Sequence, residues 1–473
     1  MRWDRFWTRW VGMLLLCVVL VWARAPVRAA PPADVTAAGR TFFVAPGGRD
    51  SNPGTPARPW RTIGKAVRTL APGDVVYIKN GVYREAIHLD WRNSGAPGRP
   101  IAYRAYPGHA PVLDGATVGT ASLGLFQMIG ANYIEISGLT IRDSRVAGIH
   151  VRDGQGITIK NNRIVRSKSS GIGIWRCSNV VVECNVLEDC RIDPEGHNEM
   201  LAIATTTDYR VAYNEIYWTD PDCCRGTSGI DVKNGSARGG VYSNYLHDLP
   251  TAGIYLDAWE LATYDHEVAG NYITHARVGI AIGSERGGTL SDLRIYNNVI
   301  HYVRYAGIGI HDYAYDGLRR DIHIYHNTVV GSYGNGGAAI LIASYNVRHI
   351  VLTNNLLNFG PDTCSGQIKA YLPWTITSVD NLVYGPKLPV DDPDLVEITR
   401  GTITVDPRFL DSAHSNFHLR ANSPARDRGS PVDLDRDHDG VRRPIGSGYD
   451  IGAYEYRAIG PMNHRSYLML VVR

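Results

Sequence analysis

The chain has 473 residues, of which 20% are charged and 44% hydrophobic, and its formal net charge is +3 at pH 7. A charge this close to neutral gives no long-range field for nucleic acid or for an anionic membrane, so we expect neither as a partner. With 16 His, 27 Tyr and 10 Trp, the chain is instead rich in side chains that combine a flat face with a polar edge.

Residues 1–29 have the pattern of a secretory signal peptide. They begin MRWDRFWTRW, continue with an apolar run from Val11 to Ala23, and end in small residues that suit cleavage near Ala29. The run is too short for a comfortable membrane span, although a retained N-terminal anchor is the alternative. Removal of these residues lowers Lys+Arg from 49 to 44 and Asp+Glu from 46 to 45, which leaves a net charge of about −1. We therefore expect a secreted or cell-surface protein with no membrane partner after cleavage.

A leader of residues 30–40 precedes a predicted N-terminal cap over residues 41–115. Within this cap, the stretch 62–70 has the spacing of a short amphipathic helix. Its apolar positions are Ile63, Ala66, Val67 and Leu70. Such a helix can cover the end of a stack of strands, whose exposed edge would otherwise pair with other chains.

Nine asparagines recur at steps of 23 to 30 residues through residues 116–385. They are Asn162, Asn185, Asn214, Asn244, Asn271, Asn298, Asn327, Asn355 and Asn381. Each lies in a segment that alternates apolar and polar residues, such as ITIKNNRI or LRIYNNVI, which is typical of a half-buried strand. A strand that recurs at such a period predicts one coil of a solenoid. Stacked Asn side chains can bond to one another, so we expect a buried asparagine ladder between parallel coils.

A second repeat, Gly-Ile-x-apolar, runs beside the first and gives each coil at least one more strand. Its glycines are Gly148, Gly171, Gly229, Gly253, Gly279 and Gly307, and Ala339 takes this place in one coil. We expect these glycines at bends between sheets, where positive φ favours Gly. The two repeats together predict an all-β, right-handed parallel β-helix, because parallel crossovers are right-handed. A leucine-rich repeat does not fit, since the LxxLxLxxN spacing and alternating helices are absent from the sequence.

The residues two and four positions after each coil glycine are predicted to face solvent. In the middle coils, these positions and those just beyond the strands hold His150, Arg152, Asp231, Lys233, Tyr255, Asp257, Glu285, His311 and Asp312. Lys233 and Asp257 share one position on successive coils, so we expect them to touch and the pKa of Asp257 to be lowered. A ladder of solvated salt bridges is the alternative interpretation.

Aromatic side chains flank this charged group. They are Trp175, Tyr255, Trp259, Tyr313 and Tyr315, and Arg176 follows Trp175 directly. Because sugar-binding clefts use such aromatic faces, the combination favours a functional face. We expect catalysis from Lys233, Asp231, Asp257, Glu285 and His311. We expect substrate binding from His150, Arg152, Trp175, Arg176, Tyr255, Trp259, Asp312 and Tyr313.

Both ends of the chain resemble a known group of proteins. The N-terminal patterns are VAPGGRDSNPGTPARPWRTIGKAV, PGDVVYIKNGVYRE and AYPGHAPVLDG, and the C-terminal pattern is NSPARDRGSPVDLDRDHDGVRRPIGSGYDIGAYEY. They resemble the opening and closing segments of pectin-lyase-like β-helix proteins, which include family 9 pectate lyases. The resemblance covers residues 41–457, with a closing segment at 386–457 before a tail at 458–473. It implies a monomeric β-helix whose partner is a polysaccharide.

The resemblance to family 9 pectate lyases is incomplete at the site. Lys233 matches a family lysine four residues after a coil glycine. The family's calcium-binding acidic positions correspond to Thr251, Ala252 and Tyr255, and its base lysine corresponds to Ala281. The resemblance therefore implies a shared scaffold without that calcium cage and base.

Two reaction types fit the charged group. In β-elimination on a uronate polymer, Lys233 or His311 would remove the C5 proton, and Arg152, Arg176 or a bound calcium would stabilise the carboxylate. Of the two reaction types, we favour this lyase reaction.

Inverting glycoside hydrolysis is the second reaction type. It would use Asp231 and Asp257, which the register places about 8 Å apart, within the range for inversion. A non-catalytic glycan-binding or surface-structural protein is the third interpretation.

The closing segment contains a possible metal site. Asp435, Asp437 and Asp439 match the start of a calcium loop, DxDxDG, although no Glu stands at its last place. A structural calcium is therefore one prediction and an acidic turn the other, and no organic cofactor is expected.

Cysteines and one acidic loop complete the candidates. An exported chain can form disulfides among Cys177, Cys184, Cys190, Cys223, Cys224 and Cys364, or keep buried thiols. Glu195, His197 and Glu199 resemble a metal-ligand cluster, but they lie in a predicted loop, which favours a solvated loop that can overhang the site.

Overall fold

The structure is a computed structural model that describes residues 39–192, 199–220, 227–312, 315–332, 337–360, 367–370, 376–385 and 397–458. The predicted signal peptide, Tyr313, Glu195, His197 and the cysteines at 223, 224 and 364 lie outside these ranges. No helix within the described ranges has the length and apolar character needed to cross a membrane.

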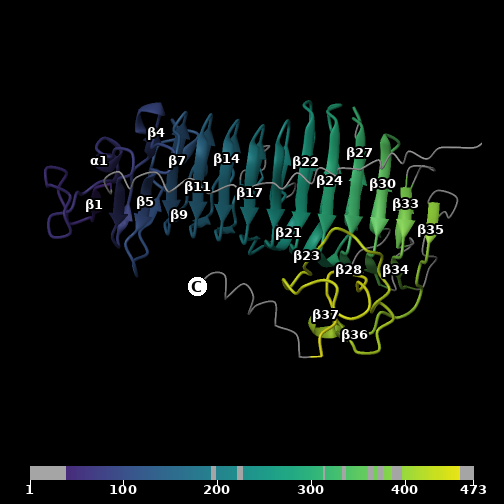
Figure 1. Cartoon of the computed structure of the whole chain (residues 1–473). Helices are drawn as coiled ribbons and strands as arrows, with labels where there is room; N and C mark the ends of the chain where they lie inside the picture. The colour runs from purple at the N-terminus through teal and green to yellow at the C-terminus, as the bar shows by residue number, and fades with distance from the viewer. Residues whose placement is uncertain are drawn as a thin grey trace, which may run out of the picture. The chain divides into compact units, whose positions relative to one another are not determined.

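Short strands stack along the chain into a solenoid (Figure 1), and two long sheets run its length. The 14-stranded sheet contains β1 (Thr41–Val44), β2 (Val75–Ile78), β5 (Ile101–Ala105), β8 (Ile134–Ser137), β11 (Gln155–Lys160), β14 (Ser178–Glu183), β17 (Thr207–Ala212), β20 (Ala237–Tyr242), β22 (Thr263–Ala269), β24 (Leu290–Tyr296), β27 (Arg319–Tyr325), β30 (Val347–Thr353), β33 (Ile376–Val379) and β35 (Glu397–Arg400).

The 21-stranded sheet has two arms in each coil. The side strands, which follow the ladder asparagines in the central coils, are β3 (Val82–Tyr83), β6 (Val112–Asp114), β9 (Thr140–Arg142), β12 (Arg163–Val165), β15 (Val186–Glu188), β18 (Glu215–Tyr217), β25 (Val299–Val303), β28 (Thr328–Ser332), β31 (Leu356–Asn358) and β34 (Leu382–Val383). The front strands are β4 (Ile87–Leu89), β7 (Gly124–Ile129), β10 (Ala147–Arg152), β13 (Ile172–Trp175), β16 (Leu201–Ala204), β19 (Ile230–Lys233), β26 (Ala306–His311), β29 (Ala338–Ala343) and β32 (Ile368–Ala370). Two long strands, β21 (Tyr245–Asp257) and β23 (Tyr272–Gly283), run through both arms.

Every strand pairing within these two sheets is parallel and keeps the alternation seen in the sequence. Ile230 of β19 pairs with Ile254 of β21, and Ile254 pairs with Ile280 of β23, so that aliphatic side chains stack coil upon coil. All three are fully buried in the core. Because burial of one such side chain contributes about 1.5–3 kcal/mol, the stacked aliphatic rows hold the coils together. The predicted all-β parallel β-helix is confirmed.

The asparagine ladder is present as predicted. Asn271 donates its backbone N–H and its Nδ2 to Oδ1 of Asn298, at 3.0 and 2.9 Å. Nδ2 also donates to the carbonyl oxygen of Val241 in the preceding coil, at 2.9 Å. The same two bonds join each successive pair of the nine asparagines. The polar side chains are thus satisfied although they are buried.

The coil glycines have a different purpose from the predicted one, because none of the six has positive φ. A Cβ at Gly279 would stand 2.5 Å from the carbonyl oxygen of Gly307 and 2.5 Å from the Ile300 side chain. Glycine is therefore needed for the close approach of successive coils. Positive φ falls instead on the residues directly before the ladder asparagines: Asn161, Cys184, Tyr213, Ser243, Gly270, Asn297, His326, Asn354 and Asp380.

The predicted N-terminal helix is present but short, as α1 (Ile63–Val67). The Thr62 hydroxyl caps it by accepting a hydrogen bond from the backbone N–H of Lys65, at 3.1 Å. Ile63 and Ala66 are buried in the main hydrophobic core. A short 3-10 helix, η1 (Trp91–Asn93), follows β4.

The closing segment packs on the side strands (Figure 1). It contains the antiparallel strands β36 (Phe409–Asp411) and β37 (Asn416–Leu419), which flank the 3-10 helix η3 (Ser412–His414). Phe417 and Tyr454 share a hydrophobic cluster with Tyr272 and Val299. Arg443 and Glu455 form a fully buried ion pair at 2.7 Å within the segment.

The three aspartates of the possible calcium loop do not converge on one point. Asp437 accepts hydrogen bonds from the backbone N–H groups of Asp439, Val441 and Glu455, at 2.8–2.9 Å. Asp439 pairs with His418 and Arg457, and the side chain of Asp435 is 87% exposed. Within the described ranges, no three His, Cys, Asp or Glu residues are grouped to hold a metal. The arrangement favours the acidic turn, the second of the two interpretations of this segment.

Candidate functional site

The front strands align the predicted site residues in one row. Asp231 pairs with Tyr255, and Lys233 pairs with Asp257 on the next coil, as the register predicts. Small residues follow, because Tyr255 pairs with Ala281 and Asp257 pairs with Gly283. At these positions, β19 therefore carries charged side chains, whereas β23 carries only small residues.

Lys233 lies in an ion-pair cluster rather than against Asp257. Its Nζ is 2.6 Å from Oδ2 of Asp231 and 2.7 Å from Oε2 of Glu199. Within the described residues no ion pair joins Lys233 to Asp257, so the predicted contact is wrong. Glu199 provides the competing partner and also lines the cleft described below.

Asp231 and Asp257 do not face solvent, contrary to the prediction. Their exposed fractions are 1% and 2%. Asp257 accepts hydrogen bonds from the backbone N–H groups of Trp259 at 2.9 Å and Glu285 at 3.3 Å. Burial and the charge of Asp231 raise the pKa of Asp257 to about 7, whereas a lowered pKa was predicted. The shift is opposite to the predicted one because Asp257 is buried and because, among the described residues, no ion pair with Lys233 offsets that burial.

Lys233 is unsuited to the predicted role of base. Burial alone would lower its pKa, but the charges of Asp231 and Glu199 outweigh burial and raise the pKa above its usual value. A lysine with a raised pKa keeps its proton at neutral pH and cannot accept another. Lys233 therefore neutralises the buried carboxylates instead.

A cleft of about 480 Å³ lies beside this cluster. It is lined by Glu199, Ser228, Thr251, Ala252, Tyr255, Arg277, Val278, Ala281, Glu285, Tyr305, His311 and Asp312. Small side chains at 252 and 281 leave the space open, and the polar groups stand around it. Four of these residues, at 251, 252, 255 and 281, occupy the positions that the family resemblance assigns to the calcium cage and the base.

His311 is a neutral imidazole in this cleft. Burial, with the charges of Arg277 and Arg319 adding to it, lowers its pKa to about 4. Its Nε2 is buried over Gly309, where a side chain would collide with the ring, and has no hydrogen-bond partner among the described residues. Tyr305 stacks on the ring with centroids 6.1 Å apart. Unprotonated at neutral pH, His311 can accept a proton.

Arg277 is a cleft residue that the sequence interpretation missed. It is exposed, lies 5.8 Å from the ring centroid of Tyr305, and forms no ion pair with a carboxylate of the described residues. Arg277 and Tyr305 both stand two positions before a coil glycine. Attention to that position, besides the two and four positions after the glycine, would have found them.

Tyr255 and Glu285 also line the cleft and are bonded to each other. The Tyr255 hydroxyl donates a hydrogen bond to Oε1 of Glu285, at 2.8 Å. With His311 and Asp312, these are the predicted site residues that the structure brings together in one cleft. Trp259 lies on the turn after β21, and Arg286 lies on the turn after β23 in the next coil. The guanidinium carbon of Arg286 is 4.9 Å from a Trp259 ring centroid.

The N-terminal members of the predicted site lie elsewhere. His150 and Arg152 are on β10 and Trp175 is on β13, and none of them lines the cleft. The indole of Trp175 lies over Gly173, and burial lowers the pKa of His150 to about 4. These residues are too many coils away to act with His311.

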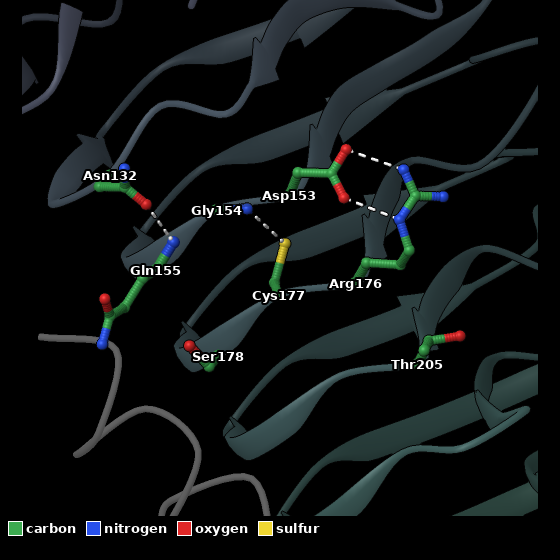
Figure 2. A pocket seen from close by; sticks show the side chains of 8 residues that line it. All are labelled: Asn132, Asp153, Gly154, Gln155, Arg176, Cys177, Ser178 and Thr205. Carbon is green, nitrogen blue, oxygen red and sulfur yellow. Dashed lines mark hydrogen bonds and ion pairs between the residues drawn. The ribbon is translucent and has the colours of Figure 1, made fainter. Parts of the chain in front are cut away.

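Arg176 belongs to a second, more open pocket of about 500 Å³ (Figure 2). There it forms a two-point ion pair with Asp153, at 2.7 Å for each contact. The buried thiol of Cys177 accepts a hydrogen bond from the N–H of Gly154 at 3.4 Å, and burial raises the pKa of this thiol to about 11. Cys177, Cys184 and Cys190 are free thiols. The pocket thus offers a neutralised ion pair and an unreactive thiol.

Comparison with known proteins supports the fold. A family model described as Pel9A-like, right-handed β-helix region matches residues 42–199, and one described as right-handed β-helix region matches residues 124–358. The uncharacterised protein YwoF of Bacillus subtilis (strain 168) is 26% identical over 480 residues, which cover 88% of this chain and 99% of YwoF.

Two solved structures are similar over nearly their whole length. Pectate lyase Pel9A has 15% identity and a TM-score of 0.52, covering 89% of this chain and 98% of its own. XylC in complex with xylose has 12% identity and a TM-score of 0.58, covering 88% and 98%. At such identities the likeness shows the fold alone. Together, the fold and the matching family models show that the chain belongs to the pectin-lyase-like superfamily of right-handed parallel β-helix proteins.

Proposed function

We propose that the protein is a secreted polysaccharide lyase that cleaves a uronate-containing glycan by β-elimination in the cleft around His311. One observation carries this proposal: a neutral histidine and an arginine without a carboxylate partner among the described residues line the same cleft. The similarity to pectate lyase Pel9A supports a polysaccharide substrate. The predicted signal peptide supports secretion.

The two side chains have complementary roles in this reaction. Arg277 binds the uronate carboxylate and stabilises the negative charge that develops there when C5 loses its proton. His311 takes that proton, the electron pair forms the C4–C5 double bond, and the glycosidic oxygen leaves C4. Solvent supplies the proton that the leaving oxygen takes up.

Substrate binding strengthens the base. The charge of Arg277 is one cause of the low pKa of His311. A bound uronate carboxylate offsets this charge, so the pKa of His311 rises toward the working pH when substrate is present. Proton transfer from C5 to His311 is then more favourable than the pKa of His311 in the free protein implies.

Inverting glycoside hydrolysis is the second candidate, and the pKa of Asp257 favours it. A carboxyl group with a pKa of about 7 can stay protonated and act as an acid. Both Asp257 and Asp231 are almost fully buried and outside the cleft lining, however, so neither meets a sugar bound there. A non-catalytic glycan-binding protein is the third candidate.

Replacement of the two proposed groups tests the lyase function. On the substrate found by a panel of uronate-containing and neutral glycans, His311→Gln is expected to lower turnover by about 10²–10⁴-fold. Arg277→Met is expected to lower turnover by about 10²–10³-fold. The matched control is Arg348→Met, an exposed arginine on β30 of the other sheet, which should retain full turnover. Full activity of both cleft variants would exclude these roles.

A further inference from the structure

The turns that join the front strands to the 14-stranded sheet stack into a continuous row. The backbone N–H of Arg176 donates to the carbonyl oxygen of Ala204, and that of Thr205 donates to Lys233, at 2.9 and 3.1 Å. Asn234 donates to Asp257 in the same way, at 3.0 Å. Further along, Arg286 forms a parallel bridge with Tyr315. Consecutive turns are therefore about 4.8 Å apart, as are the coils.

Aromatic side chains stand on this row at the C-terminal side of the molecule. Trp259, Tyr315 and Tyr345 occupy turns after β21, β26 and β29. Tyr315 is 72% exposed and Tyr345 is 65% exposed. Trp259 is partly buried, and the guanidinium carbon of Arg286 lies 4.9 Å from its ring centroid. One exposed aromatic residue is ordinary, but two strongly exposed tyrosines on adjacent turns of the row, with a partly exposed tryptophan two coils before the first of them, leave several ring faces open to solvent.

The row borders the cleft directly. Glu285 and Asp312 line the cleft, and Arg286 and Tyr315 follow them on the same two turns. The neighbouring turn holds Ser344 and Tyr345, and the Ser344 hydroxyl donates to Asp316 at 2.8 Å. A linear ligand that leaves the cleft parallel to the solenoid axis would therefore pass over the exposed rings.

We propose that Trp259, Tyr315 and Tyr345 form a stacking track that holds a linear polysaccharide along the solenoid axis beside the cleft. The apolar faces of successive sugar rings lie on the aromatic rings, and Arg286, which is paired with Glu260 at 3.4 Å, offers N–H donors between them. This inference rests on the proposed polysaccharide substrate of the cleft. It adds that the protein binds long chains, with several sugars outside the reacting pair.

The opposite end of the row does not share this chemistry. The pocket in Figure 2 lies on the same row of turns, but its described lining contains no aromatic ring and its charged side chains are paired with each other. The track therefore extends from the cleft toward the C-terminal coils.

Binding measurements on alanine variants test the track. Affinity gel electrophoresis with immobilised polygalacturonate, alginate or xylan is run on the full chain in a His311→Gln background, so that no probe is consumed. Tyr315→Ala and Tyr345→Ala together are expected to weaken retardation by the best-bound polymer by about tenfold. The control Tyr264→Ala, a 42% exposed tyrosine on β22, should match the background, and melting temperatures should be unchanged.

Three results would overturn the track. They are retardation unchanged by the double variant, no retardation of the parent protein by any of the three polymers, and a change of oligomeric state in place of a change in polymer binding. Turnover distinguishes this inference from the proposed function. If the tyrosine variants lose polymer binding while the wild-type protein makes no unsaturated product, the track stands and the lyase function fails.

Discussion

At the scale of single residues, the site depends on which carboxylate each cation meets. Lys233 is taken up by Asp231 and Glu199, so it carries a fixed positive charge inside a buried group. Arg277 meets no carboxylate of the described residues and stays available to a ligand. His311, near Arg277 and buried, remains neutral. The charged side chains therefore contribute to two places, a buried ion-pair cluster around Lys233 and an open cleft around His311.

The pH dependence of turnover reports the base. His311 has a pKa of about 4 in the free protein, below its ordinary value, so its reactive neutral form is lost only under acidic conditions. We expect kcat/KM to rise with pH to half its plateau near pH 4, because kcat/KM reports the free enzyme. A half-point near the ordinary histidine value of about 6.5 would contradict this environment of His311.

The raised pKa of Asp257 predicts that the free energy of unfolding falls as pH rises. The pKa of this carboxyl group is raised to about 7 from the ordinary value of 3.8, so between these pH values the folded protein binds a proton that the unfolded chain has lost. This contribution to stability is complete below pH 3.8 and is lost as pH rises through about 7. Asp257→Asn keeps an oxygen acceptor for the two backbone N–H groups but cannot ionise.

The wild-type protein should therefore lose more stability between pH 5 and pH 8 than Asp257→Asn, by about 2 kcal/mol. Denaturant unfolding at the two pH values measures this difference. Equal losses in both proteins would show that Asp257 has an ordinary pKa.

The register of the site could be predicted from the sequence, but its burial could not. Counting from the coil glycines places Lys233 opposite Asp257, and the structure confirms this pairing. The count does not say what covers the strands. Glu199 comes from a segment outside the repeat, and its approach decides the partner of Lys233. Burial, which the count also does not give, decides the pKa of Asp257. Long-range contacts of this kind leave no periodic signal.

At the scale of strands and turns, two kinds of repeat make the coils fit. The asparagines satisfy the polar groups at one bend, and the glycines let successive backbones approach at another. Both repeats could be read from the sequence because each coil needs the same residue at the same place. The physical reason for the glycines could not, since positive φ and close approach select the same amino acid.

Alanine at a coil glycine tests close approach. In Gly279→Ala, the new methyl group would collide with the Gly307 carbonyl and with Ile300, so we expect a loss of about 1–3 kcal/mol in the free energy of unfolding. Gly47→Ala is the matched control, because a Cβ there meets nothing within 4 Å. Equal melting temperatures for the two variants would remove the argument for backbone packing.

At the scale of the whole molecule, the closing segment covers the side strands of the C-terminal coils and leaves their front strands uncovered (Figure 1). Phe417 and Tyr454 bury the aromatic surface of Tyr272, and Arg443 with Glu455 fixes the segment internally. The closing pattern in the sequence predicts such a segment, but not the face on which it packs. That face is chosen by the side chains of several coils acting together.

Calcium is not expected to stabilise this segment. The carboxylates of Asp437 and Asp439 already accept hydrogen bonds and ion pairs within it. A metal that binds only the folded state would raise the melting temperature by mass action. We expect melting curves in calcium and in chelator to superimpose. A rise of several degrees in calcium would restore the predicted metal site.

The ratio of unsaturated ends to new reducing ends tests the central claim most directly. β-Elimination creates one C4–C5 double bond for each new reducing end, so ultraviolet absorbance and a reducing-sugar assay on the same digest of a uronate glycan should give equal numbers of both. The wild-type protein is expected to give this one-to-one ratio, and His311→Gln should form both products more slowly. New reducing ends without unsaturated ends would identify a hydrolase and contradict the account.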